Sequence, residues 1–342
     1  MRLIVDTIEY CTKYVPQWYT ISISGYHIRE AGSTAVQELA FTLADGFSYV
    51  EAAMERGLNV DDFAPRLSFF FNSHNNFFEE ICKYRAARRI WAKRMKNKYG
   101  AKKPESMRLR FHTQTAGVSL TAQEPENNII RVTLQGLAAV LGGTQSLHTN
   151  SFDEALCLPT EKAVKIALRT QQIIAHESGA TDTVDPLAGS YYVEWLTNKM
   201  EEEAEKYFER IEELGGVIPA IKANFFQKEI ANASYKYQKE IENQERTIVA
   251  VNQFQLREPC TTPLLKIDEE VAKQQMERLN KIKAERNNDK VMETLEKLKG
   301  AARGTENLMP YIMDAVREYA SIGEIIDALK EIFGTYQEDS VF

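Results

Sequence analysis

A tyrosine and a histidine stand side by side at positions 26 and 27, directly after a short run of alternating residues. Within that run, alternation puts hydroxyl-bearing residues on one face and Ile21 and Ile23 on the other. The run therefore predicts a strand over residues 20–26 that ends in two ring side chains. Because α/β proteins place their chemistry at the carboxyl ends of parallel strands, Tyr26 and His27 are the first candidates for a catalytic role.

Three later segments with strand-like patterns carry polar side chains as well. By alternation, the paired candidates of the first two segments each lie on one face of the predicted strand. The candidates are Arg66 and Ser68 on 66–73, His112 and Gln114 on 108–117, and Gln145 on 144–150. Together with Tyr26 and His27, the imidazole and the two amides predict a pocket of neutral hydrogen-bond donors and acceptors. For each residue, the alternative is a buried polar group that its neighbours satisfy.

The predicted strands recur with a spacing of about 40 residues, and a helical pattern fills each interval. The helices expected there cover residues 29–45, 47–56, 75–100 and 125–143. This alternation is typical of a (β/α)8 TIM barrel, of which about four β/α units are present. Further helices are expected at 2–14, 160–178, 192–214, 217–243 and 268–299, with a pair near 306–333.

The fold prediction is therefore the second half of a TIM barrel followed by a helical region. Residues 1–158 would form the half-barrel, and residues 159–342 a helical C-terminal region that packs on it. Four parallel strands would leave two open edges, which are prone to aggregation. We therefore expect another polypeptide to supply the missing half. The alternative is an open four-stranded sheet that the helical region covers.

Composition excludes several classes of protein. The net charge of −7 argues against a general nucleic-acid binder, and no stretch approaches the apolar length needed to span a membrane. The amphipathic N-terminus lacks the pattern of a signal peptide. The four cysteines are far apart and form no CxxC pair. The sequence therefore predicts neither a disulfide framework nor a zinc site, and it favours a reducing, cytoplasmic location.

Two local patterns predict the starts of helices. Asn76 followed by Glu79, and Ser151 followed by Glu154, have the spacing of a capping box. In a capping box, two side chains each accept a hydrogen bond from a backbone N–H of the first helical turn. The second pattern gives Glu154 a structural role at a helix N-terminus, which competes with a role in binding.

Four long segments are specific enough to point to a family. They read ISISGYHIREAGSTAVQELAFTLADGFSYV, FAPRLSFFFNSHNNFFEEICKYRAARRIWA, MRLRFHTQTAGVSLTAQEPENNIIR and LGGTQSLHTNSFDEALCLPTEKAVKIALRTQQII. These segments closely resemble the large, catalytic subunit of the adenosylcobalamin-dependent acyl-CoA mutases, the family of methylmalonyl-CoA mutase. The resemblance continues through DPLAGSYYVEWLT to NLMPYIMDAVREYASIGEIIDALKEIFGTY, so it covers essentially the whole chain.

The resemblance implies a coenzyme-B12-dependent radical rearrangement of an acyl-CoA, with (R)-methylmalonyl-CoA to succinyl-CoA as the first expectation. Isobutyryl-CoA and 2-hydroxyisobutyryl-CoA are the alternative substrates, and a truncated, non-catalytic barrel fragment is the alternative to an enzyme component. The acyl-CoA would thread along the barrel axis, where small interior serines leave room for its pantetheine chain. Adenosylcobalamin would lie across the C-terminal face, with its main binding domain on another chain.

The resemblance also implies a role for each candidate residue. His27 would hydrogen-bond the thioester carbonyl, and Tyr26 would wall the radical intermediate. The remaining assignments are Arg66, Ser68, His112, Gln114 and Gln145 to the substrate and its CoA, Glu30 to the corrin, and Asn150 and Glu154 to the ribose of the deoxyadenosyl group. No residue is assigned to a metal.

The chain departs from the family pattern in ways that bear on its partners. The family's N-terminal strands carry a tyrosine that promotes cobalt–carbon cleavage and an arginine that reads the methylmalonyl carboxylate. These strands have no counterpart here, and neither has the D-x-H-x-x-G motif of the cobalamin-binding domain. We therefore expect a hetero-oligomer with an N-terminal half-barrel chain and a separate B12-binding subunit. Val118 replaces a tryptophan common in methylmalonyl-CoA mutases, which leaves the acyl group open.

Overall fold

The structure is a computed structural model, and it describes residues 1–256 and 262–338. Contacts between residues divide the chain into two units. We call Ile21–Leu265 the sheet unit, and Met1–Thr20 together with Lys266–Ser340 the helical unit. These boundaries differ from the predicted domain boundary after residue 158, which stays a prediction.

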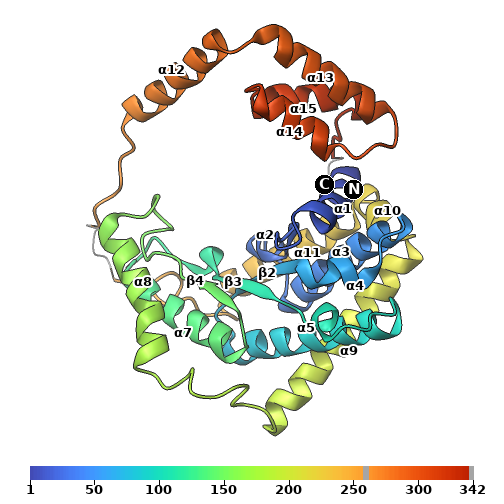
Figure 1. Ribbon diagram of the computed structural model, residues 1–342. Coiled ribbons are helices and arrows are strands. Elements are labelled where there is room, and N and C mark those ends of the chain that lie inside the picture. The colour runs from blue at the N-terminus through green and yellow to red at the C-terminus, as the bar shows by residue number, and fades with distance from the viewer. Residues whose placement is uncertain (257–261, 339–342) are drawn as a thin grey trace. The chain divides into compact units, whose positions relative to one another are not determined.

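The sheet unit is built on four parallel strands, as the sequence predicts (Figure 1). They are β1 (Ile21–Ser24), β2 (Leu67–Ser73), β3 (Phe111–Thr115) and β4 (Ser146–His148), in that spatial order. Within the described residues, β1 and β4 each have a strand neighbour on one side only. The α/β architecture is that of a partial TIM barrel, with two unpaired edges.

One face of the sheet is apolar and buried. Its members alternate along the strands, and each is at most 2% exposed: Ile23, Leu67, Phe69, Phe71 and Phe111. Burying a side chain of this size contributes about 1.5–3 kcal/mol, so this face holds the sheet to its helices. The strands therefore form where branched and aromatic residues recur at every second position.

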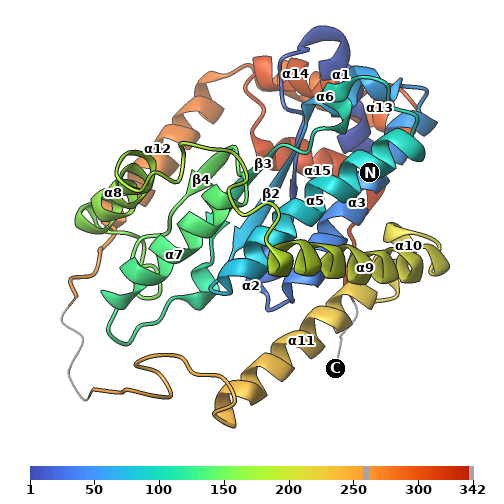
Figure 2. The same ribbon diagram turned by 90° about the horizontal axis from the view of Figure 1, so that it is seen from below.

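Helices from the crossover connections cover this apolar face (Figure 2). They are α3 (Ala35–Glu55), α5 (Phe77–Asn97) and α7 (Asn127–Leu141), with α9 (Tyr191–Glu213) packed on α3 and α5. The fully buried Trp91 of α5 meets Phe69 of the sheet edge to face, with ring centroids 4.9 Å apart. The crossover helices thus bury the apolar face and leave the opposite face of the sheet free of them.

The second face, which we call the polar face, carries hydroxyl, imidazole and amide groups. The parallel register aligns its members in rows across the sheet. The rows are Ser22 and Ser68; Ser24, Phe70, His112 and Ser146; and Asn72, Gln114 and His148. This arrangement matches the expectation that small polar groups line what would be the inside of a closed barrel.

The first strand is shorter than predicted, because the chain turns into a helix at Gly25. The Gly25 carbonyl accepts the Arg29 N–H at 3.0 Å, which starts α2 (Tyr26–Glu30). Tyr26 and His27 therefore lie on a helix rather than at the end of a strand, and that prediction was wrong. Gly25 is needed at this turn, because a Cβ there would stand 2.0 Å from Thr42 Oγ1.

Four predicted helices have different ends from those expected. The helices expected at 29–45 and 47–56 are the short α2 and one continuous α3. The segment 217–243 breaks at Asn224, whose φ of 54° separates α10 (Val217–Lys222) from α11 (Phe225–Glu242). The segment 268–299 breaks near Asn287, which caps α13 by accepting the Lys290 N–H at 3.1 Å. The two helices there are α12 (Glu269–Glu285) and α13 (Asn288–Arg303).

Both predicted capping boxes are absent from the described structure. Asn76 makes no side-chain hydrogen bond at the start of α5, and residues 151–158 form turns rather than a helix. The boxes that do form involve Thr34 at α3 and Ser321 at α15 (Ile322–Phe333). The remaining short or intervening elements are α4 (Val60–Phe63), η1 (Ala64–Arg66), α6 (Pro104–Met107), η2 (Gly117–Ser119) and α8 (Glu161–His176).

The helical unit has a small core of its own. It contains α1 (Arg2–Tyr14), α12, α13, α14 (Met309–Arg317) and α15. The buried members of its core are Leu298, Ala301, Ala302, Leu308, Ala315, Ile325 and Leu329. Arg2 ties α1 to this core, because its guanidinium donates to the carbonyls of Ala301 and Ala302 at 2.9 and 2.7 Å.

Candidate active site

Three of the predicted residues meet at the carboxyl ends of the strands. Gln114 Nε2 donates to Tyr26 Oη and to Asn150 Oδ1, both at 2.9 Å. Asn150 is fixed in turn by Thr115, whose hydroxyl accepts the Asn150 N–H and whose carbonyl accepts its side-chain amide, each at 2.9 Å. The result is an amide held in a defined orientation at the end of the polar face.

Aromatic rings continue this surface along the sheet. Tyr26 stacks on Phe70 with ring centroids 5.1 Å apart, and Phe70 meets His112 edge to face at 4.8 Å. His112 Nδ1 lies 2.6 Å from Ser146 Oγ. Burial, followed by the nearby His148, lowers the pKa of His112, so the ring is neutral at pH 7. The polar face therefore offers hydrogen-bonding groups beside apolar rings.

His27 projects from the first turn of α2 and is exposed. Its Nδ1 lies 3.3 Å from Ser24 Oγ, at the end of β1. Burial of part of the ring lowers the pKa of His27, which favours the neutral imidazole. When Ser24 donates to Nδ1, Nε2 carries the proton and is available as a donor to a ligand.

Two carboxylates converge on Gly117, just after β3. Glu30 Oε1 accepts Asn72 Nδ2 and Glu30 Oε2 accepts the Val118 N–H, both at 2.7 Å. A Cβ on Gly117 would lie 2.7 Å from Glu154 Oε1 and 3.1 Å from Glu30 Oε2, so only glycine leaves both acids in place. Glu154 is exposed as a residue, but partial burial of its carboxylate, with the charge of Glu30, raises its pKa to about 7. Burial also raises the pKa of Glu30.

We expect Glu154 to make the stability of the fold fall as pH rises from about 4.5 to about 7. Its folded-state pKa lies above the unfolded value, so the native chain holds more protons in this window, and stability declines through it. Glu154→Gln removes that decline. The Tm of the variant relative to wild type should therefore rise between about pH 4 and about pH 8 in thermal unfolding. Glu177→Gln, an exposed glutamate just beyond α8, is the control; a pH-independent difference for Glu154→Gln would contradict the raised pKa.

The remaining candidates lie toward the amino ends of the strands. Arg66 is half-buried in η1, directly before β2, and Ser68 Oγ donates to the Ile21 carbonyl at 3.2 Å. Gln145 Oε1 accepts the Phe111 N–H at 2.7 Å, so this side chain caps the start of β3. The structure therefore does not bring Gln145 into the predicted pocket with Tyr26 and Gln114.

Asn72 is the residue at this site that the sequence analysis missed. It is fully buried at the carboxyl end of β2 and donates to Glu30. The signal was present, because Asn72 follows Ser68 and Phe70 in the same alternation and pairs in register with Gln114.

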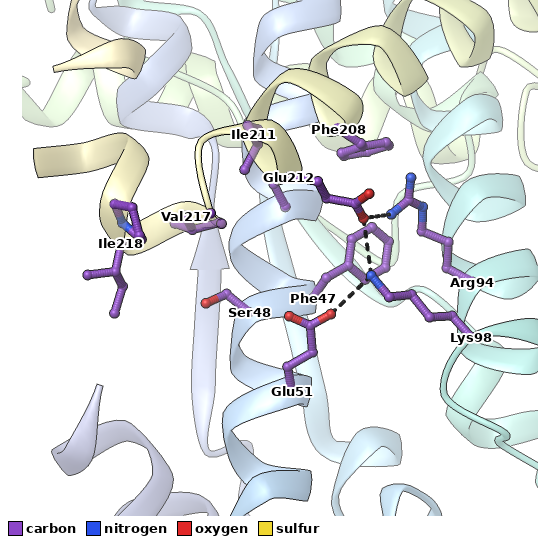
Figure 3. Close-up of a pocket in the computed structure, with 14 residues that line it drawn as sticks. Phe47, Ser48, Glu51, Arg94, Lys98, Phe208, Ile211, Glu212, Val217 and Ile218 are labelled. Atoms are coloured by element: carbon purple, nitrogen blue, oxygen red, sulfur yellow. Dashed lines mark hydrogen bonds and ion pairs between the residues drawn. The ribbon is translucent and has the colours of Figure 1, made fainter. Parts of the chain in front are cut away.

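A cavity of about 200 Å³ lies elsewhere, between α3, α5, α9 and α10 (Figure 3). Its charged groups neutralise one another: Lys98 Nζ stands 3.2 Å from both Glu51 and Glu212. Arg94 is 3.7 Å from Glu212 and lies over the Phe208 ring, 4.2 Å from its centroid. The cavity shares no residue with the polar face, and its ion pairs join helices.

Within residues 1–256 and 262–338, no group of three or more His, Cys, Asp or Glu side chains is placed to hold a metal ion. Among the helices described, none has both the length and the apolar character that crossing a membrane requires.

Comparison with known proteins identifies the family. A family model described as methylmalonyl-CoA mutase matches residues 1–335. The chain is 46% identical to the 2-hydroxyisobutanoyl-CoA mutase large subunit of Aquincola tertiaricarbonis, over 100% of this chain and 61% of that protein. It is 48% identical to methylmalonyl-CoA mutase of Rhizobium meliloti and 47% identical to that of Escherichia coli, each over 98% of this chain and 47% of the relative. It thus spans about half to three-fifths of these relatives, and throughout its own length it belongs to the methylmalonyl-CoA mutase family.

Proposed function

We propose that this chain is half of the catalytic barrel of a cobalamin-dependent mutase that isomerises the carbon skeleton of an acyl-CoA. The first candidate reaction is (R)-methylmalonyl-CoA to succinyl-CoA. The observation that carries the proposal is the polar face, with Tyr26, Gln114 and Asn150 linked by hydrogen bonds at its carboxyl end, in a chain of this family.

The length of the polar face suits a long, thin ligand. Ser68 and Asn72 are four residues apart on β2, which corresponds to about 13 Å along the strand. Arg66 stands at the amino end of this path, where a guanidinium suits a CoA phosphate. Small serines between the two ends leave room for a pantetheine chain. An acyl-CoA would therefore extend from Arg66 to the cluster around Tyr26.

His27 would act on the thioester in this arrangement. A neutral imidazole that donates from Nε2 stabilises negative charge as it develops on the thioester oxygen. Gln114 would hold the acyl group, and its own orientation is fixed by Tyr26 and Asn150. The stacked rings of Tyr26 and Phe70 would exclude water from the reacting carbons.

The acidic end of the polar face fits the sugar of adenosylcobalamin. Glu30 and Glu154 present acceptor oxygens around Gly117, and Asn150 brings its Nδ2 donor to the same place. Ribose hydroxyls both donate and accept hydrogen bonds, so they suit this set. Adenosylcobalamin, when bound, supplies the radical that starts the rearrangement. This chain's residues would orient the deoxyadenosyl group, and Glu30 would face the corrin. The main cobalamin-binding domain would be on another chain.

The two unpaired strand edges support a partner chain. Parallel strands close into a barrel only when each has two neighbours, and β1 and β4 each have one within the described structure. The chain also spans only about half to three-fifths of its relatives' length. We propose that an N-terminal half-barrel polypeptide pairs with both edges, and that a B12-binding subunit completes a hetero-oligomer.

Reconstitution tests the proposal directly. The purified chain is assayed with methylmalonyl-CoA and adenosylcobalamin, alone and after co-expression with the half-barrel polypeptide and the B12-binding subunit. We expect turnover only from the assembled mixture. Turnover by the chain alone would overturn the half-barrel proposal, and a stable assembly without turnover would favour a non-catalytic fragment.

A second substrate follows from a specific relative. The 2-hydroxyisobutanoyl-CoA mutase large subunit is similar to this chain over the whole length of this chain. Val118, half exposed beside Glu30, also stands where methylmalonyl-CoA mutases commonly have a tryptophan. Comparing kcat/KM for methylmalonyl-CoA, isobutyryl-CoA and 2-hydroxyisobutyryl-CoA in the assembled enzyme decides among the three.

A further inference from the structure

The peptide group of Asn72 lies where β2 runs past the end of β1. Gly25 N–H still donates to the Phe70 carbonyl at 2.8 Å, but the Gly25 carbonyl is taken by Arg29 in α2. The next N–H of β2 on this side, that of Asn72, therefore has no strand partner. Glu38 Oε1 accepts it instead, at 2.6 Å. A carboxylate from α3 thus replaces the missing strand.

The backbone carbonyl of Asn72 also accepts hydrogen bonds from side chains. It accepts Lys83 Nζ at 2.7 Å and Tyr84 Oη at 2.6 Å. Lys83 is fully buried, and its ammonium also pairs with Glu38 at 2.6 Å and with Glu80. The backbone N–H and the backbone carbonyl of Asn72 are therefore bound by the side chains of Glu38, Lys83 and Tyr84 rather than by a neighbouring strand.

The side chain of Asn72 connects this fixed backbone to the Glu30 carboxylate. Its Nδ2 donates to Glu30 Oε1 at 2.7 Å, while its Oδ1 has no hydrogen-bond partner in the parts of the chain that the structure describes. A buried amide oxygen without a hydrogen-bond partner lowers the stability of the fold. Its retention here suggests that the donor end of the same amide has a function. The donor has a single acceptor at the site, which is the Glu30 carboxylate.

We propose that Asn72 is a positioning residue that fixes the Glu30 carboxylate, and that Glu38 and Lys83 act through it by clamping its peptide. Glu30 lies on a five-residue helix, so its carboxylate needs support from outside that helix. The Val118 N–H binds one oxygen and Asn72 binds the other. The catalytic consequence of this inference rests on the proposed function, whereas the positioning itself does not.

The positioning has a measurable electrostatic effect. Burial raises the pKa of Glu30, and the hydrogen bonds from Val118 and Asn72 oppose that rise. The other titratable groups that face Glu30 are Tyr26 on the same helix and Glu154 from the loop after β4. Loss of the Asn72 donor should therefore leave the Glu30 carboxylate less stabilised in its charged form.

The first test uses the chain by itself. Glutamate labelled with 13C at the carboxyl carbon gives a titration curve for Glu30, whose signal is assigned by its loss in Glu30→Gln. In Asn72→Leu we expect the pKa of Glu30 to rise by about one pH unit. Thr113→Val is the matched control, because it removes one buried side-chain hydroxyl from the opposite face of β3 and should leave Glu30 unchanged.

The titration of Glu30 in the Asn72 variants decides whether Asn72 positions that carboxylate. An unchanged pKa of Glu30 in Asn72→Leu would overturn the proposal, and Asn72→Ala supplies the same measurement if leucine prevents folding. In the assembled enzyme, Asn72→Leu should lower kcat about tenfold with KM for the acyl-CoA within about twofold. If wild-type assembly shows no turnover, the proposed function fails, yet the titration still shows whether Asn72 positions Glu30.

Discussion

His27→Ala should lower kcat of the assembled enzyme by about a thousandfold while the chain remains as stable as wild type. The imidazole is exposed on the first turn of α2, and its Nδ1 lies 3.3 Å from Ser24 Oγ. Removing it leaves no buried group unpaired, so the cost in folding should be small. The loss in rate follows from removing a donor to the oxygen on which charge develops.

The matched control for His27 is His176→Ala. His176 is an exposed histidine in the last turn of α8, so the chemical change is the same at a position outside the polar face. Steady-state kinetics should show a loss for His27→Ala and none for His176→Ala. Because the loss is expected in kcat, KM should change little. A His27→Ala enzyme that binds acyl-CoA poorly but turns over normally would contradict the assigned role.

Lys83→Met should reduce the free energy of unfolding by about 3–5 kcal/mol. The ammonium is fully buried and pairs with Glu38 and Glu80. Its removal therefore leaves two buried carboxylates without this positive charge. Arg29 lies 3.9 Å from Glu38 and 3.5 Å from Glu80, which compensates in part. A domain is typically stable by about 5–15 kcal/mol, so this single change takes away a large share.

The pH dependence identifies the cause of that loss. Burial already holds the pKa of Glu38 above its unfolded value although Lys83 opposes the rise, whereas the attraction of Lys83 and Arg29 holds the pKa of Glu80 below its own. Without Lys83, both pKa values should rise, because burial disfavours the charged forms. The native variant then binds more protons than the unfolded chain, and its stability falls as pH rises. Urea unfolding followed by circular dichroism should therefore show a smaller deficit near about pH 5 than near about pH 8.

A combined variant serves as the control for Lys83→Met. Adding Glu38→Gln removes one carboxylate charge, keeps a side chain of similar size and leaves Glu80 paired with Arg29 at 3.5 Å. Most of the lost stability should return, because the cost of Lys83→Met is the unpaired charge rather than lost packing. Equal deficits for the single and the combined variants would show that packing of the Lys83 stem is what matters.

The sequence was sufficient to predict the sheet and most of its helices. Strands β1 to β4 all follow period-two patterns, and burial of Phe69, Phe71 and Phe111 on one face explains why those patterns predict strands. The proximity of Tyr26 to Gln114 could also be anticipated from the strand patterns, whereas Asn150 was assigned to the site only through the family resemblance. The resemblance to the acyl-CoA mutases agrees with the family that the comparisons show.

The rest depended on contacts that local patterns do not encode. The helix breaks at Asn224, which adopts a left-handed backbone conformation although it is neither glycine nor proline. The capping boxes predicted at Asn76 and Ser151 do not form, although the spacing of their residues is right. Gln145 follows alternation yet turns its amide to the Phe111 N–H. Alternation places Asn72 on the polar face, but its hydrogen bonds to Glu38 and Glu30, 34 and 42 residues away, are tertiary contacts that no local pattern shows.

The buried charges behind Asn72 also constrain how this protein can change by descent. A substitution at Glu38, Glu80 or Lys83 alone leaves a buried charge without its counterpart. Lineages should therefore exchange these positions together, or not at all, and intermediates with one exchange should be rare. An alignment of relatives in which the three positions vary independently would show that natural drift escapes this constraint.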